Sequence, residues 1–223
     1  TELNDNYATI VELNSETDFA AKDANFLAFS DNVRDFISKN KITDVITFND
    51  TDIEDQRKTL VQTIGENIQI RRVETIDFNP QNNKAIYLHS DSKLGSIVSI
   101  KVGDDSVAKD IAMHVAAFNP LCLSQDGLES DVLERERAIY QKQAEESGKP
   151  KEIMDKMVDG KIKRYLSEVS LLSQSFVKDP DITVQDYIES NNAEILAFKR
   201  LKVGEGIEVE VKDFAEEVAE QLK

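Results

Sequence analysis

The chain has 223 residues, of which 40% are hydrophobic and 31% charged, so it is long enough for one large domain or two modest ones. No apolar run approaches the roughly 20 residues of a membrane span, and residues 1–6 lack the basic and apolar regions of a signal peptide, so we expect a cytoplasmic protein. The net charge of -16 has the wrong sign for neutralising nucleic-acid phosphates, and the single cysteine, Cys122, permits no internal disulfide.

The first segment predicts a strand, a corner and a helix. Residues 7–13 alternate strand-forming side chains with a period of two, which is typical of a half-buried strand. Thr17 is placed to cap a short helical turn that begins at Asp18, and a longer helix follows from Asp23. In this pattern alone, Asp18 caps the turn and Phe19 packs inward. The longer helix carries an apolar stripe made of Phe26, Phe29, Val33 and Phe36 or Ile37.

A second helix and three strands follow. Thr51 and Glu54 have the spacing of a capping box, and Gly65 is placed to end the helix that starts there. Strands are expected at residues 67–76, 85–89 and 97–102. Alternation breaks at Arg71 and Arg72 in the first of these strands, which predicts a bulge. The first half therefore indicates helices packed on a small, mostly antiparallel sheet.

His114 lies on the apolar face of a helix predicted over residues 106–118. A lone histidine in such a position is more often a core residue than a ligand. Since His89 is the only other histidine in the sequence, we expect no histidine-based metal site and no metal cofactor.

Two amphipathic segments, residues 128–147 and 151–169, flank Gly148 and Pro150 and predict an antiparallel helical hairpin. Both an ordinary helical pair within the globule and a protruding coiled coil fit this pattern. The remaining elements are a non-helical connector at 170–180, a short helix from Thr183, strands at 193–202 and 207–211, and a closing amphipathic helix with Phe214, Val218 and Leu222.

These elements predict an α+β protein with two subdomains of helices packed on small antiparallel sheets, and with a protruding helical hairpin. We expect an N-terminal subdomain over residues 1–120 and a C-terminal subdomain over 121–211 that includes the hairpin at 128–169. Residues 212–223 form a separate helical module in this division.

Several runs resemble the elongation factor Ts family. They are residues 11–26 (VELNSETDFAAKDANF), 111–117 (IAMHVAA) and 147–153 (SGKPKEI), followed by the C-terminal helix. The similarity extends from about Tyr7 to the end and resembles the family core without the small ubiquitin-associated-like helical domain that usually precedes it. It favours projection of the hairpin as a coiled coil. A bacterial cytoplasmic protein is expected, although a mitochondrial one also fits, because a transit peptide would already have been removed.

The resemblance implies a set of partner contacts. In this family the pair that matches Asp18 and Phe19 inserts into the GTPase domain of elongation factor Tu and disturbs its Mg²⁺ and phosphate region. Leu94 beside Gly95 matches a loop position that approaches the partner, whereas Lys178 stands where a methionine is frequent. The implied contacts beyond the wedge are Leu94, Gly95, His114, Phe176, Val177, Phe214 and Val218.

The function implied by the resemblance is guanine-nucleotide exchange on elongation factor Tu, without covalent chemistry and without a cofactor. The sequence shows no glycine-rich phosphate loop, nucleophile motif or metal cluster, so we expect no nucleotide bound by the chain itself. Two alternatives stay open from the residues: an enzyme that uses carboxylates such as Asp18 and Glu16 as acid and base, and a passive scaffold that binds the GTPase without exchange.

Overall fold

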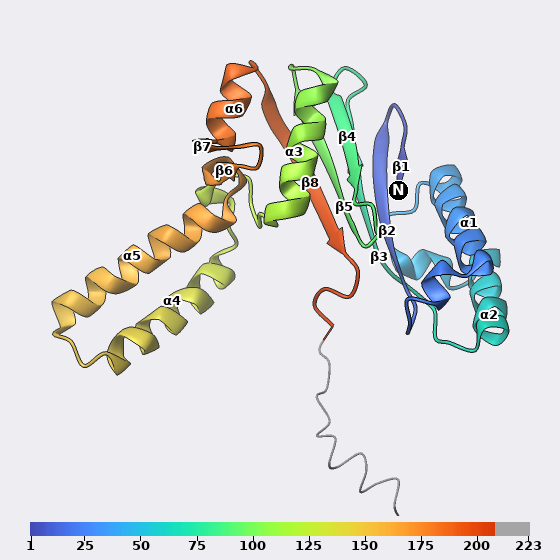
Figure 1. Cartoon of the computed structure of the whole chain (residues 1–223), viewed down its shortest axis with the longest axis horizontal. Coiled ribbons are helices and arrows are strands. Elements are labelled where there is room, and N and C mark those ends of the chain that lie inside the picture. The colour runs from blue at the N-terminus through green and yellow to red at the C-terminus, as the bar shows by residue number, and fades with distance from the viewer. Residues whose placement is uncertain (208–223) are drawn as a thin grey trace, which may run out of the picture.

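The computed structural model describes residues 1–207 and has the α+β fold predicted from the sequence (Figure 1). Helices lie beside small antiparallel sheets, and one helical hairpin extends away from them. The strands are β1 (Glu2–Leu3), β2 (Tyr7–Asn14), β3 (Gln69–Asp77), β4 (Asn83–Leu88), β5 (Leu94–Lys101), β6 (Ser175–Phe176), β7 (Asp179–Thr183) and β8 (Glu194–Lys202). The helices are α1 (Ala24–Asn40), α2 (Asp52–Ile64), α3 (Asp105–Phe118), α4 (Ser130–Glu146), α5 (Lys151–Val169) and α6 (Val184–Ser190).

The first sheet contains β1, β2 and β3 in that order, with antiparallel pairing throughout. Its register shifts between Glu12, which lies opposite Arg72, and Leu13, which lies opposite Ile70. Arg71 is therefore an extra residue in β3, and the bulge predicted at this point is confirmed. Because of the bulge, both arginines reach the buried Glu12 carboxylate.

Helices α1 and α2 pack on the first sheet and share a core with it. α2 ends at Gly65, as predicted, because its φ of +80° suits a residue without a side chain. The predicted capping box is wrong. Thr51 Oγ1 donates to the Phe48 carbonyl at 2.7 Å, and Glu54 instead accepts two bonds from Arg57 at 2.8 Å. The shared core contains Phe26, Phe29, Val33, Ile37, Leu60 and Ile68.

The second sheet has the order β4, β5, β8, with antiparallel pairing. β8 comes from the far end of the described chain, and it pairs with β5 along nearly its whole length. Helix α3 packs on this sheet through Val107, Ile111 and Val115. The boundary proposed at residue 120 thus falls between two strands of one sheet, and the division into subdomains stays a prediction.

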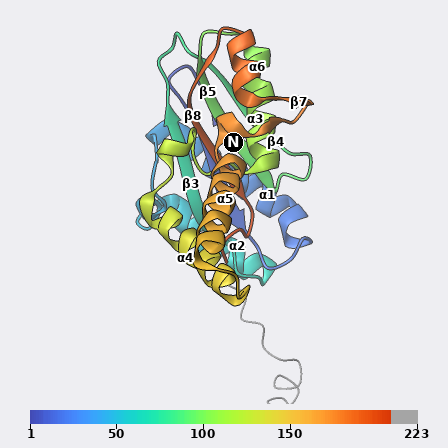
Figure 2. The ribbon, with the colours of Figure 1, turned by 90° about the vertical axis from the view of Figure 1, so that its left-hand side faces the viewer.

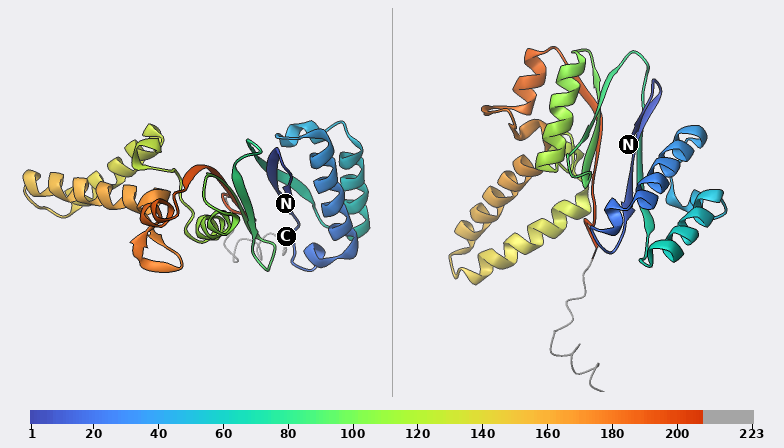
Figure 3. Two further views of the ribbon diagram at one scale, coloured as in Figure 1. Left: turned by 90° about the horizontal axis from the view of Figure 1, so that it is seen from above. Right: turned by 45° about the vertical axis from the view of Figure 1, so that its right-hand side comes forward.

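The two sheets pack against each other, with α1 and α2 on one outer side and α3 on the other (Figure 3). Their contact is apolar, and burying each of its large side chains stabilises the fold by about 1.5–3 kcal/mol. It is formed by Ala8, Ile10, Ile76, Phe78, Ile97 and Leu201.

Helices α4 and α5 form an antiparallel hairpin that extends from the sheets and faces the viewer in Figure 2. Its seam buries Ala144, Val158 and Ile162, and the Tyr140 and Tyr165 rings meet edge-on with centroids 6.4 Å apart. The predicted helical pair is confirmed, within two residues at each end.

The segment after the hairpin contains more structure than the predicted connector. It holds a 3₁₀ turn (Leu171–Ser173) and the two-stranded sheet of β6 and β7. α6 then begins with a capping box in which Thr183 and Asp186 exchange hydrogen bonds. The closing helix, with Phe214 and Val218, and nearly all of the strand predicted at 207–211 lie outside the described residues. Among residues 1–207, no helix is long and apolar enough to span a membrane.

Candidate functional site

The corner between β2 and α1 is braced against the end of α2. The backbone N–H and the hydroxyl of Thr17 donate to the Glu66 carboxylate at 2.9 and 2.6 Å. The same hydroxyl accepts a bond from the Ala20 N–H at 3.2 Å, so Thr17 caps the turn as predicted. The regular 3₁₀ turn, Ala20–Lys22, begins two residues later than expected. These bonds fix the backbone on both sides of Asp18 and Phe19.

Phe19 projects from this corner into solvent. Its side chain is 88% exposed, the highest value among the large hydrophobic residues that the structure describes, whereas the neighbouring Ala20 is buried. The alternative in which Phe19 packs inward is therefore wrong. Scattered exposed apolar side chains are common, but an aromatic ring at a braced corner beside a carboxylate has the form of an interface anchor.

Asp18 forms an ion pair with Lys93 rather than capping the turn. Lys93 lies in the turn between β4 and β5, and its Nζ donates to Asp18 Oδ1 at 2.6 Å. The hydrogen bond from Lys93, together with its charge, lowers the pKa of the Asp18 carboxyl group. Asp18 is therefore a charged, 70% exposed carboxylate next to the exposed ring.

A cleft of about 390 Å³ opens beside the corner. The corner, the start of α1 and the turn that carries Lys93 line it together with Val203, just after β8. Residues 15–18 and the β4 to β5 turn, which are far apart in the sequence, thus line one cleft.

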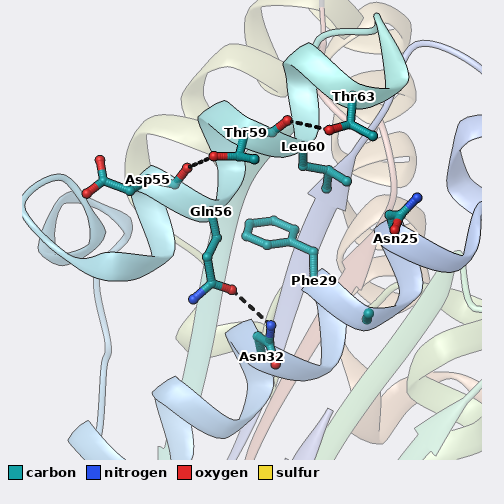
Figure 4. Close-up of a pocket in the computed structure, with 9 residues that line it drawn as sticks. Asn25, Phe29, Asn32, Asp55, Gln56, Thr59, Leu60 and Thr63 are labelled. Carbon is teal, nitrogen blue, oxygen red and sulfur yellow. Dashed lines mark hydrogen bonds between the residues drawn. The ribbon is translucent and has the colours of Figure 1, made fainter.

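A second hollow, of about 380 Å³, lies between α1 and α2 (Figure 4). Phe29 and Leu60 provide its apolar wall, and the Asn32 amide donates to Gln56 Oε1 across it at 2.9 Å. The hydroxyls of Thr59 and Thr63 donate to carbonyls of their own helix. These bonds occupy several of its polar groups within the protein, and we assign no chemistry to the hollow.

Leu94 and Gly95 lie in a strand and not in a loop. They are the first two residues of β5, and Gly95 pairs with Leu88 on one side and with Leu201 on the other. Gly95 is buried and Leu94 half-buried. The residue of this region that reaches the Asp18 corner is Lys93, which sequence reasoning missed because nothing local marks a partner 75 residues away.

His114 is a core residue. It has no exposed surface, and its Nε2 lies 2.9 Å from Gln174 Oε1 while its Nδ1 accepts the Val177 N–H at 3.1 Å. This pair of bonds requires the neutral ring with the proton on Nε2. Burial lowers the pKa of His114, against a smaller opposing effect of the Gln174 bond. In this structure His114 offers a partner no surface, and it instead holds the backbone at Val177.

Phe176 also belongs to the core, whereas Val177 is half-buried. The Phe176 ring stacks on Tyr187 with centroids 4.0 Å apart. Lys178, which follows, pairs with Asp110 at 2.5 Å. Of this segment, Val177 and Lys178 retain surface for a partner. Phe214 and Val218 lie outside the described residues.

Comparisons with known proteins identify the family. A family model described as Elongation factor TS matches residues 16–205. Elongation factor Ts of Hahella chejuensis (strain KCTC 2396) is 47% identical over 217 residues, which cover 97% of this chain and 75% of that protein. Elongation factor Ts of Legionella pneumophila (strain Paris) is 44% identical over 222 residues, covering 97% of this chain and 75% of the relative. The chain belongs to the elongation factor Ts family.

Membership of the elongation factor Ts family confirms the resemblance seen in the sequence. The matched range contains the Asp18 and Phe19 corner, the turn with Lys93, the hairpin and β8. A third relative, Elongation factor Ts of Hydrogenovibrio crunogenus (strain DSM 25203 / XCL-2), is 44% identical over 218 residues, covering 95% of this chain and 73% of that protein. In residues 1–207, no group of three or more His, Cys, Asp or Glu residues could hold a metal ion.

Proposed function

We propose that the chain is a guanine-nucleotide exchange factor for elongation factor Tu in the bacterial cytoplasm. The observation that carries this proposal is the braced corner at which an ionised Asp18 and an 88% exposed Phe19 stand side by side. It is supported by membership of the elongation factor Ts family. The chain acts by binding, with no covalent step.

Phe19 is the apolar anchor of this proposal and enters a pocket of the GTPase domain. Asp18 then lies near the Mg²⁺ and phosphate region, where Mg²⁺ depends on few protein ligands besides phosphate and water. A carboxylate inserted there competes for the polar contacts that hold the nucleotide. The fixed backbone at Thr17 and Ala20 supports this role, because a corner that is already ordered loses less conformational entropy on binding than a flexible one.

One wedge is not sufficient for nucleotide release. Changing a site from 99:1 occupied to 1:99 requires about 5.5 kcal/mol of differential binding. An anchor residue at the lower end of the hot-spot range accounts for about 2 kcal/mol of this. We therefore propose further contacts through Leu94, Val177 and the C-terminal module with Phe214 and Val218. Gly95, His114 and Phe176 support these contacts from the interior, since all three are buried.

A passive scaffold is the second candidate, favoured by the extended hairpin of α4 and α5, which offers a binding surface far from the corner (Figure 1). A scaffold forms a ternary complex with the GTPase and its nucleotide. An exchange factor and the nucleotide instead weaken each other's binding reciprocally. The two candidates therefore differ in whether GDP stays bound.

Phe19→Ala is expected to slow stimulated GDP release from elongation factor Tu by about 30-fold, the equivalent of the 2 kcal/mol lost with an anchor residue. Because the ring is almost fully exposed, its loss changes the free energy of unfolding by less than about 0.5 kcal/mol. Stopped-flow release of fluorescent GDP measures the first quantity, and urea unfolding the second.

The matched control is Ile46→Ala. Ile46 is also a large apolar residue, 69% exposed, but it lies in the 3₁₀ turn Val45–Phe48 before α2. Its truncation should leave release unchanged. Equal release rates for Phe19→Ala and the wild type, with both proteins folded, refute the wedge.

A further inference from the structure

Lys93 connects three segments that are distant in the sequence. Its Nζ donates to Asp18 at the corner, and its carbonyl accepts the Val203 N–H just after β8 at 2.8 Å. Its own N–H donates to Asp91 Oδ1 at 2.9 Å, which folds the turn between β4 and β5. One residue thus ties the corner to the point where the chain leaves the second sheet.

A second set of hydrogen bonds links the segment after β8 to β2 and β3. The next residue after Val203, Gly204, donates its N–H to the buried Glu12 carboxylate at 2.8 Å. Arg72, which also binds Glu12, donates to the Lys202 carbonyl at 2.8 Å. Glu12 lies in β2, the strand that leads into the corner. The end of β8 is therefore held from both sides, by Lys93 and by Glu12.

Of the cations around the cleft, Lys93 is the one that forms a hydrogen-bonded ion pair with Asp18. The cleft is lined by the acidic residues Glu16, Asp18, Asp31 and Asp91 and by the basic residues Arg34 and Lys93. Arg34 is engaged by Asp31 and Asp35 at 2.9 Å each. Lys22 acts on Asp18 only through its charge, without a hydrogen bond. Without Lys93, Asp18 would have no hydrogen-bonded cation in this cleft.

We propose that Lys93 is a positioning residue of the exchange corner, which directs the Asp18 carboxylate beside Phe19 and locks the corner to the segment that leads out of β8. This inference rests on the proposed function, because the residue that it positions is the proposed wedge. The Lys93 side chain orients Asp18. The bond from Val203 is to the Lys93 backbone carbonyl, so any residue at position 93 can accept it. Replacing the side chain therefore tests the positioning alone.

Lys93→Met keeps most of the length of the side chain and removes its charge. It is expected to slow stimulated GDP release by about 1.4- to fivefold, the range for a solvent-exposed ion pair. Lys93→Arg, which keeps a cation in reach, should restore most of the rate. The matched control is Lys199→Met, because Lys199 is similarly exposed and pairs with Glu74 at 2.9 Å away from the corner. This variant should stimulate GDP release from elongation factor Tu at the wild-type rate.

A double substitution separates positioning from a direct contact. If Lys93 acts through Asp18, adding Lys93→Met to Asp18→Asn causes no further loss. The double variant then stimulates GDP release from elongation factor Tu as fast as Asp18→Asn alone. Carboxyl NMR titration of the free protein supplies a readout independent of the GTPase: Lys93→Met should raise the pKa of Asp18 toward its ordinary value, and Lys199→Met should not.

The inference is overturned if the Asp18 titration is unchanged in Lys93→Met, or if the two substitutions slow release additively. It is also overturned if Asp18→Asn slows release and Lys93→Met does not. Failure of the proposed wedge gives a different result. Asp18→Asn and Phe19→Ala would then both stimulate GDP release at the wild-type rate, while Lys93→Met would still raise the pKa of Asp18.

Discussion

Phe176→Ala is expected to lower the free energy of unfolding by about 3–5 kcal/mol. The ring is buried between Tyr187 and the His114 ring, whose centroids lie 4.0 and 6.1 Å from its own. Its removal leaves a cavity in the core that α3, α6 and β8 share. Urea unfolding followed by circular dichroism measures the loss.

Phe19→Ala is the matched control for this substitution, because it removes the same atoms from an almost fully exposed position. The two variants should differ by at least about 2.5 kcal/mol. A similar, small loss of unfolding free energy in both variants would mean that the Phe176 ring is not packed in solution. The ring would then be free to contact a partner directly.

Glu12→Ala is expected to cost about 3 kcal/mol of unfolding free energy, the lower end of the range for breaking a buried ion pair. The carboxylate is buried and accepts bonds from Arg71, Arg72 and Gly204. The lower end applies because both arginines keep contact with water. Glu74→Ala is the control, since its pair with Lys199 is much more exposed than the Glu12 carboxylate and worth less than about 1 kcal/mol.

The contribution of Glu12 should also depend on pH. Burial acts to raise the pKa of Glu12, but the bonds from Arg72, Gly204 and Arg71 together lower it below the ordinary 4.5. The stabilisation is therefore fully present above pH 4.5 and is lost as the pH falls through the pKa of the folded state. Glu12→Ala should unfold with a smaller acid dependence than the wild type. An equal acid dependence in both proteins contradicts this assignment.

The sequence predicted those parts of the fold that local patterns determine. The apolar stripe of α1 and the bulge at Arg71 depend on side-chain periodicity, and Gly65 marks the end of α2 through its positive φ. The capping box at Thr51 failed because Arg57 competes for the Glu54 carboxylate, a contact that the four-residue motif does not include.

Local patterns did not predict which strands pair when they are far apart in the sequence. β8 joins β5 after an interval of about ninety residues, a choice governed by the packing of the whole sheet rather than by either strand alone. The short strand β1 was not predicted either, because two residues carry no periodicity. β8 contributes Leu201 to the contact between the two sheets, and Val203 just after it lines the cleft beside the corner.

The candidate site was predicted in part. The sequence marked Asp18 and Phe19, but its pattern alone placed the ring inside, and only the resemblance to a family indicated a wedge. Burial then separated residues that the motifs treat alike: His114 and Phe176 are core, whereas Phe19 is exposed. Lys93 carries no local signal, since its role arises from a fold that brings the β4 to β5 turn to the corner.

Titration of elongation factor Tu preloaded with fluorescent GDP tests the central claim most directly. As the chain is added, bound GDP fluorescence and complex formation are followed in the same sample. An exchange factor lowers the affinity for GDP by the same factor by which GDP lowers the affinity for the chain. Emptying an almost fully occupied site requires this factor to be about 10⁴. We predict release of GDP as the binary protein complex forms. A stable ternary complex that retains GDP at its original affinity would contradict the account.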